Sequence, residues 1–104
     1  MTASLVYVTT TPDEAGRIGK VVLTDNLAAS VNILPEVRSI YRWEKKIHDQ
    51  KEALLIAKTS SRRVDELIER IRSLHSYQCP CIVAWRLDAG KATYLDWIKS
   101  ETAQ

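Results

Sequence analysis

The residues with the most evident chemistry lie together in the segment 74–81, LHSYQCPC. Cys79 and Cys81 are two positions apart, and on an extended strand such residues point to the same side. Thiolates bind soft ions such as Cu(I) and Zn(II), and imidazole binds copper and zinc. His75 lies where a helix should end, and a short turn there could bring its ring near both thiols. The segment therefore predicts a metal site formed by His75, Cys79 and Cys81, with copper or zinc as the ion.

The same residues have a structural interpretation, which the sequence leaves open. Free cysteine is among the most buried residue types and behaves as a small hydrophobic side chain. A histidine at a helix C-terminus often interacts with the last carbonyl groups. A disulfide between Cys79 and Cys81 would be at the strained limit of disulfide geometry, so we expect reduced thiols. A Cys-x-Cys pair with one histidine also indicates a metal site less strongly than a doubled Cys-x-x-Cys.

No motif in the sequence indicates catalysis or an organic cofactor. The chain has no Gly-x-Gly-x-x-Gly, Walker loop, nucleophile elbow or His-Glu-x-x-His, and no nucleophile is paired with a base. We therefore expect no enzymatic activity and assign no catalytic residue.

A second candidate site is a cleft between subunits, in which aromatic and basic side chains could hold an anionic small molecule. Its candidate residues are Tyr41, Trp43, Trp85, Trp97, Arg38, Arg42, Lys58 and Arg86. Because Trp, Tyr and Arg are also enriched at interface cores, packing between subunits is the competing interpretation.

Length and charge exclude several classes of protein. The chain has 104 residues, which fits one domain spanning residues 1–104. Its net charge of +2 comes from interspersed charges, whereas a nucleic-acid surface usually shows a clustered basic stripe. No apolar run approaches the roughly 18 residues of a membrane span, and the N-terminus lacks the basic region of a signal peptide. We therefore expect a cytoplasmic protein that binds neither nucleic acid nor membrane.

The order of the predicted elements positions the candidate residues. A strand over 5–8 leads into a helix that begins at Pro12, capped by Thr11, and ends near Asp25-Asn26. The later elements are a long hairpin over 31–60, a helix over 64–74 capped by Ser60 or Ser61, a strand over 81–87 and a helix over 91–101. This β-α-β-β-α-β-α order predicts an α+β fold: a ferredoxin-like split βαβ sandwich with an antiparallel sheet, helices on one face and an additional C-terminal helix.

The hairpin is the longest predicted element. Apolar and polar residues alternate over Val31–Ile47, which is typical of a strand with one buried face, and we place the turn at Asp49-Gln50. Pro35 cannot donate to a ladder, so we expect a bulge or an edge there. An arm of this length overhangs any core that so short a chain can build. We therefore expect other copies of the chain to cover its apolar residues, with Tyr41, Trp43 and Ile47 in the interface.

Five segments in their order and spacing resemble the CutA divalent-cation tolerance family. They are VYVTTTPDEA (6–15), LAASVNILPEVRSIYRWEKKI (27–47), EALLIAKT (52–59), LHSYQCPCIVA (74–84) and YLDWI (94–98). The resemblance covers nearly the whole chain and implies a ferredoxin-like subunit that forms a homotrimer through its long hairpin. It also implies a role in tolerance of copper and other divalent metals, with metal ions as partners. An architecture similar to the PII proteins gives the alternative: a signalling or scaffold trimer that binds a small molecule or protein in its intersubunit clefts.

The chain departs from the family patterns at several positions. Some bacterial members have a cysteine near the end of the first strand and a histidine pair at the end of the second helix. This chain has Thr9 and Leu74-His75 there, so His75 alone carries over as a metal ligand. Four further motif positions are occupied by Ser30, Lys45, Ser76 and Cys81. Cys79 and Cys81 would supply thiolates that the family pattern does not contain.

Overall fold

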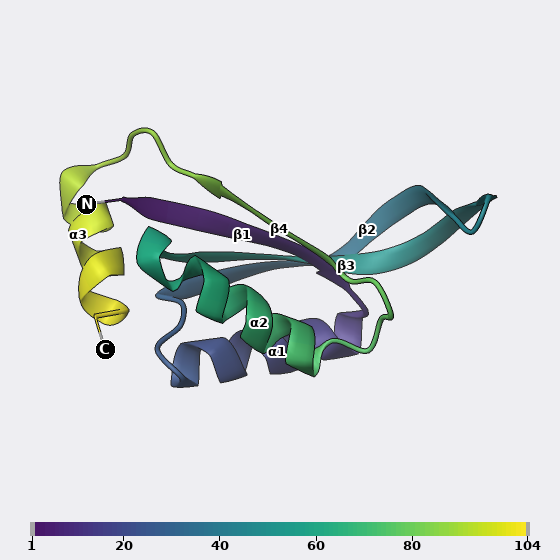
Figure 1. Ribbon diagram of the computed structural model, residues 1–104, viewed down its shortest axis with the longest axis horizontal. Helices are drawn as coiled ribbons and strands as arrows, with labels where there is room; N and C mark the ends of the chain where they lie inside the picture. Colours follow the sequence, from purple (N-terminus) through teal and green to yellow (C-terminus); the bar gives the residue numbers. More distant parts are fainter. Residues whose placement is uncertain (1, 104) are drawn as a thin grey trace.

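The computed structural model describes residues 2–103 and has the predicted order of elements (Figure 1). The elements are β1 (Ala3–Thr10), α1 (Pro12–Thr24), β2 (Ser30–Trp43), β3 (Lys46–Ser60), the 3-10 turn η1 (Ser61–Arg63), α2 (Val64–Leu74), β4 (Cys81–Arg86) and α3 (Ala92–Glu101). The four strands form one antiparallel sheet in the order β2-β3-β1-β4. Helices α1 and α2 lie on one side of this sheet, and α3 lies at the end opposite the hairpin (Figure 1). This architecture confirms the predicted α+β, ferredoxin-like fold.

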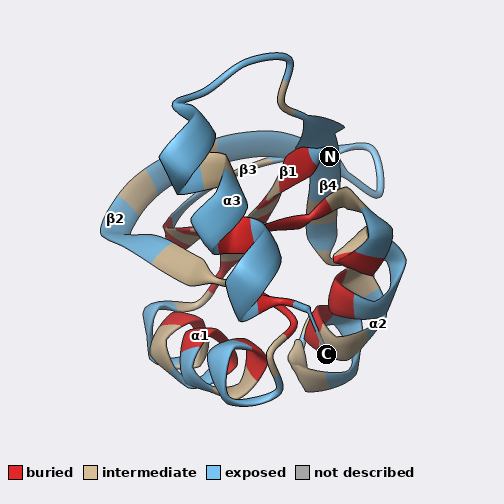
Figure 2. Ribbon diagram, turned by 90° about the vertical axis from the view of Figure 1, so that its left-hand side faces the viewer, coloured by how far each residue is buried: buried red, intermediate tan, exposed pale blue. Residues whose placement is uncertain are grey.

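Alternation along β1 divides the sheet into a covered face and an open face. Val6, Val8 and Thr10 are fully buried, whereas Tyr7 and Thr9 between them are partly exposed. Val6 and Val8 belong to a core between the sheet and the two helices (Figure 2), together with Ile18, Val22, Leu55, Leu67 and Ile71. The open face therefore carries Tyr7 and its neighbours on a side without α1 or α2.

The first helix begins and ends as its sequence predicts. The Thr11 side chain accepts a hydrogen bond from the backbone N–H of Glu14 at 3.3 Å, and Pro12 occupies the first helical position. The helix ends at Thr24 with Asp25 as its C-cap, and the next residue, Asn26, has a φ of 59°. Asparagine tolerates this left-handed conformation, which ends the helix and turns the chain back toward the sheet.

The hairpin turn lies at Glu44-Lys45, so the predicted turn at Asp49-Gln50 is wrong. Glu44 and Lys45 have φ values of 51° and 67°, as a two-residue type I′ turn requires. Asp49 instead pairs with Ile40 in the ladder, and Ile47 therefore lies on β3 rather than at the end of β2. The error has a physical cause. An overhanging pair of strands faces solvent, so a polar run such as 48–52 does not have to mark a turn.

The bulge predicted at Pro35 is confirmed. The β2–β3 register shifts between Leu34 and Val37, so Pro35 and Glu36 interrupt the ladder. The predicted buried face of the first arm is absent within one subunit, because no residue of β2 is buried. Ile40 is 61% exposed and Ile47 is 62% exposed on the projecting hairpin (Figure 1).

The predicted serine cap of the second helix is wrong. Neither Ser60 nor Ser61 caps α2, because the 3-10 turn η1 precedes the helix. The Ser60 hydroxyl lies 2.7 Å from the hydroxyl of Thr102, and the Ser61 hydroxyl lies 2.7 Å from that of Ser4. Arg63 Nε donates to the Thr102 carbonyl at 3.1 Å. Ser60 therefore joins the end of β3 to the residue after α3, and Ser61 joins η1 to the start of β1, instead of capping α2.

Within residues 2–103, none of the helices combines the length and the apolar character that crossing a membrane would require.

Candidate functional site

His75 directly follows α2, and its side chain is fully buried. Its Nε2 lies 2.8 Å from the Thr9 carbonyl, and its Nδ1 lies 3.2 Å from the backbone nitrogen of Tyr77. The tautomer with the proton on Nε2 satisfies both contacts, since Nε2 then donates and Nδ1 accepts. The Tyr77 ring packs against the imidazole with centroids 4.6 Å apart. Both ring nitrogens are therefore engaged in joining the end of α2 to β1.

Glu14 is the charged neighbour of His75. Its Oε1 accepts a hydrogen bond from the Thr10 hydroxyl at 2.6 Å and lies 3.8 Å from His75 Nδ1. Burial raises the pKa of Glu14, but hydrogen bonds from Ser76 and Thr10 outweigh this effect and bring the pKa below its ordinary value. The carboxylate is therefore part of the same hydrogen-bonded junction between β1, α1 and the segment after α2.

Cys79 and Cys81 are free, exposed and line the same groove. Cys81 is the first residue of β4 and pairs with Thr9, whereas Cys79 precedes the strand. The fully buried ring of His75 is not on the lining of this groove. In the described part of the chain, no group of three His, Cys, Asp or Glu side chains is placed to hold a metal ion. The structure thus brings the two thiols to one groove without assembling the predicted three-residue site.

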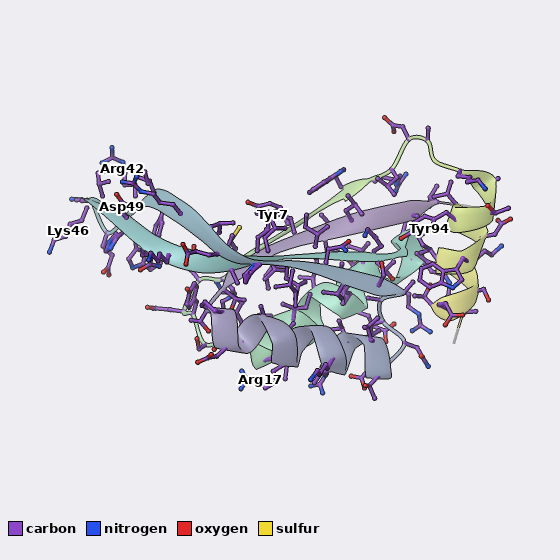
Figure 3. The ribbon with its side chains drawn as sticks, turned by 180° about the vertical axis from the view of Figure 1, so that it is seen from behind. Tyr7, Arg17, Arg42, Lys46, Asp49 and Tyr94 are labelled. Atoms are coloured by element: carbon purple, nitrogen blue, oxygen red, sulfur yellow. The ribbon has the colours of Figure 1, made fainter. Side chains whose placement is uncertain are left out.

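The groove has a volume of about 700 Å³ and lies where the hairpin leaves the sheet. Its lining residues are Tyr7, Thr9, Arg38, Ser39, Ile40, Tyr41, Trp43, Gln50, Glu52, Tyr77, Gln78, Cys79 and Cys81. Figure 3 shows Tyr7 on the side of the sheet opposite to Arg17 of α1. The groove is therefore on the open face, away from the core.

One hydrogen bond in the groove joins residues that are distant in sequence. The Tyr77 hydroxyl donates to Oε2 of Glu52 at 2.6 Å, and Glu52 is only 3% exposed. Burial, followed by the bond to Glu52, raises the pKa of Tyr77 well above its ordinary value. Sequence reasoning missed this pair, because 24 residues separate the two positions. The one feature of the sequence that pointed to a special role for Glu52 was its position directly before the apolar run ALLIA.

The residues of the predicted anionic-ligand cleft lie in different parts of the subunit. Of its basic candidates, Arg38 alone lines the groove, and Asp49 accepts bonds of 2.9 and 2.6 Å from its guanidinium. Lys58 donates to the side chain of Asn32, and Arg42 lies near the end of the hairpin (Figure 3). Trp85 packs against Tyr7 with ring centroids 6.4 Å apart, and Trp97 packs against Tyr94 with centroids 5.5 Å apart. The predicted basic residues thus do not converge on one site.

The three predicted interface residues lie on the projecting hairpin. Tyr41 and Trp43 belong to β2 and line the groove, with 37% and 39% of their surfaces exposed. Tyr41 stacks on His48 of β3 at a centroid distance of 5.3 Å. Ile47 pairs with Arg42 and is among the most exposed apolar residues. All three are available to another copy of the chain.

Comparisons with known proteins agree with this geometry. A family model described as CutA1 divalent ion tolerance protein matches residues 4–101. The divalent-cation tolerance protein CutA of Thermus thermophilus is 39% identical, over 94% of this chain and 96% of that protein. Its solved structure matches with a TM-score of 0.92 at 38% identity, covering 96% of this chain and 98% of that chain.

Two further relatives extend the comparison. The chloroplastic protein CutA 1 of rice is 39% identical over 96% of this chain, which spans only 57% of that longer protein. A solved structure described as the PII-like protein CutA from Nostoc, in apo form, has a TM-score of 0.88 at 31% identity, covering 98% of this chain and 97% of that one. The family match spans nearly all of the described residues and agrees with the fold and the hairpin. The chain therefore belongs to the CutA1 divalent ion tolerance protein family.

Proposed function

We propose that this chain acts in the response to metal ions, as a cytoplasmic homotrimer of the CutA type that binds copper or a similar ion. The observation that carries the metal proposal is the pair of free thiols, Cys79 and Cys81, on the lining of one groove. Thiolates favour Cu(I) and Zn(II) over hard ions. No catalytic step belongs to the proposal, since the family is described by tolerance of divalent ions and not by a reaction.

The two thiols, rather than His75, are the ligands that we assign. His75 would have to give up its hydrogen bonds to Thr9 and Tyr77 before either ring nitrogen could reach a metal. Cys79 and Cys81 need no such exchange, because both are exposed. Zinc usually has four ligands, so water or groups from a neighbouring subunit would complete its coordination. Two thiolates alone make a simpler site for Cu(I).

Trimer formation is supported by apolar surface on the open face and the hairpin. Val83 and Trp85 of β4 are 52% and 46% exposed, on the same sheet as the uncovered hairpin residues. Strand β2 is also an edge strand, and an exposed edge of this length invites pairing with other chains. A closed ring of three copies would cover these residues and leave no edge for further growth.

Competition titration with Cu(I) and Zn(II) under reducing conditions tests the metal proposal. Replacing both cysteines by serine should abolish most of the binding, whereas the control His48→Gln should bind as the unchanged protein does. Affinity should also fall with falling pH, because thiols must lose their protons to bind. Equal affinities for the cysteine double variant and the unchanged protein would refute the assignment.

A second candidate function is a PII-like signalling or scaffold trimer that binds a small molecule in the groove. The groove of about 700 Å³ favours it, since small-molecule sites usually measure roughly 300–1,000 Å³. The description of the Nostoc structure as PII-like is consistent with this candidate. The same metal titrations separate the two functions. A PII-like trimer would not need Cys79 or Cys81 to bind its ligand, so it does not predict a loss of metal affinity in the cysteine double variant.

A further inference from the structure

We infer that the hydrogen bond between Tyr77 and Glu52 fixes the direction in which the hairpin leaves the sheet, and that both are positioning residues for assembly through the hairpin. The inference rests on the proposed homotrimer, in which the hairpin contacts other copies of the chain. It requires no access to the groove, because the bond lies within one subunit and Glu52 is only 3% exposed. Other copies that cover the open face would leave the bond in place.

Glu52 lies at the point where the hairpin loses the support of the sheet. Strand β3 pairs with β1 as far as Ala53, which is opposite Thr10, and from Glu52 to the turn it pairs with β2. The bulge of β2, between Leu34 and Val37, is at the same level, since Val37 is the partner of Glu52. A bulge bends its strand and increases the local twist, and a two-stranded hairpin by itself is only marginally stable in water. The ladder alone therefore defines the direction of the hairpin weakly.

Tyr77 is held to the body of the subunit by contacts of its own. Its backbone nitrogen lies 3.2 Å from Nδ1 of His75, and its ring packs against the imidazole at a centroid distance of 4.6 Å. Nε2 of His75 in turn lies 2.8 Å from the Thr9 carbonyl on β1. Figure 1 shows the segment between α2 and β4 beside the point where the hairpin leaves the sheet. These contacts form one continuous connection from β1 through His75 and Tyr77 to Glu52 on the hairpin.

The bond between Tyr77 and Glu52 is suited to hold the hairpin in one direction. The hydroxyl donates to Oε2 of the carboxylate at 2.6 Å, and a hydrogen bond to a charged group is about twice as strong as one between neutral groups. A hairpin that moved away from the body would break this bond and leave a buried carboxylate without its donor, which is costly. Assembly requires the hairpins of several copies in one orientation, and a preset direction lowers the entropy cost of bringing them together.

Double electron–electron resonance between two spin labels measures the direction of the hairpin. One label is attached at Lys46→Cys near the end of the hairpin (Figure 3), and the other at Lys20→Cys on α1. Both positions are exposed. The labelled chain carries serine in place of Cys79 and Cys81, so that the labels react at the two chosen positions and no metal is involved. Dilution with unlabelled chains restricts the measured distances to those within one subunit.

Removal of one hydroxyl tests the bond. We expect a single narrow distance distribution for the labelled parent chain and a clearly broader one for Tyr77→Phe, which keeps the ring and loses the donor to Glu52. The matched control is Tyr94→Phe, which removes the hydroxyl of an exposed tyrosine on α3 and should leave the distribution narrow. A broad distribution for the parent chain, or an equally narrow one for Tyr77→Phe, would overturn the inference.

Two further variants separate the direction of the hairpin from the stability of the subunit. Glu52→Gln retains an acceptor for the Tyr77 hydroxyl, so it should keep the narrow distribution. The double change of Tyr77→Phe with Glu52→Met removes both polar partners and leaves no unsatisfied carboxylate, so it should fold even if Tyr77→Phe alone does not. This double variant should still give the broad distribution, and a narrow one would contradict the inference.

Sedimentation of the unlabelled protein at decreasing concentration measures the consequence for assembly. If loss of the hydroxyl lowers the share of hairpins in the assembling orientation to about one tenth, the apparent affinity between subunits falls about tenfold. Tyr77→Phe should then dissociate at about tenfold higher protein concentration than the unchanged protein, and Tyr94→Phe should not differ from it. Equal dissociation of Tyr77→Phe and the unchanged protein would refute the positioning role. An unchanged protein that is always monomeric would instead refute the proposed homotrimer, while the distances within one subunit would still test the bond.

Discussion

At the scale of single residues, His75 differs most from its sequence-based interpretation. Its position after a helix and close to two cysteines in the sequence suggested a metal ligand, but its ring lies in the interior and contacts Thr9 and Tyr77. The alternative, a histidine that bonds a backbone carbonyl, could be read from the sequence. The carbonyl itself could not, because Thr9 is on a strand 66 residues away.

Replacing His75 by alanine separates a structural role from a ligand role. We expect the free energy of unfolding to fall by about 1–3 kcal/mol, because the Thr9 carbonyl loses the donor that the fully buried His75 ring supplies. Chemical denaturation at fixed protein concentration measures this change, and His48→Ala on the solvent-exposed hairpin is the control, with an expected loss below about 1 kcal/mol. Metal affinity should not change. A stable His75→Ala protein that had lost its metal affinity would contradict this assignment.

The carboxylate of Glu14 predicts a pH dependence of stability. Its pKa in the folded chain is depressed below the ordinary 4.5, since hydrogen bonds from Ser76 and Thr10 outweigh the effect of burial. A depressed pKa contributes stability that is present above 4.5 and is lost as the pH falls through the lower folded value. Unfolding followed between neutral and acidic pH should show this loss, and Glu14→Gln should flatten the dependence. An identical pH profile for the variant would exclude Glu14 as its source.

At the scale of elements, the helices could be predicted more accurately than the hairpin turn. The start of α1 was predictable because Thr11 and Pro12 act locally, within a few residues of the bonds they influence. The bulge at Pro35 was predictable for the same reason. The turn was not, because Glu44 and Lys45 adopt left-handed conformations without the Asn-Gly sequence that usually marks them. The serines at 60 and 61 contact residues far along the chain, which no local pattern reveals.

The turn itself supplies a stability prediction. A residue other than glycine in the left-handed region costs about 1–2 kcal/mol, so Lys45→Gly should raise the free energy of unfolding by about 1 kcal/mol after the added chain entropy is subtracted. The neighbouring substitution Lys46→Gly is the control. Lys46 is a strand residue without a positive φ, so glycine there should destabilise by about 0.5–1 kcal/mol. Thermal unfolding measures both effects. A shift of the two melting temperatures in the same direction would contradict the turn assignment.

At the scale of the whole molecule, the subunit is elongated, with extents of 44 × 26 × 22 Å. The hairpin projects from the body (Figure 1), and most residues of its strand β2 are exposed. The sequence indicated this overhang because its apolar alternation continues beyond any core that the chain can form. It could not indicate the groove, whose lining comes from three separate parts of the chain.

The proposed function combines two properties of the whole molecule: the chain forms a homotrimer, and the trimer binds metal through Cys79 and Cys81. Native mass spectrometry of the reduced protein with Cu(I), under anaerobic conditions, measures both properties in one experiment. We predict a species of three times the 11.8 kDa subunit mass that carries one ion per subunit. The double change of Cys79 and Cys81 to serine should give the same trimer without the ions. A mass of one subunit, or a trimer whose bound copper is unaffected by loss of both thiols, would contradict the account.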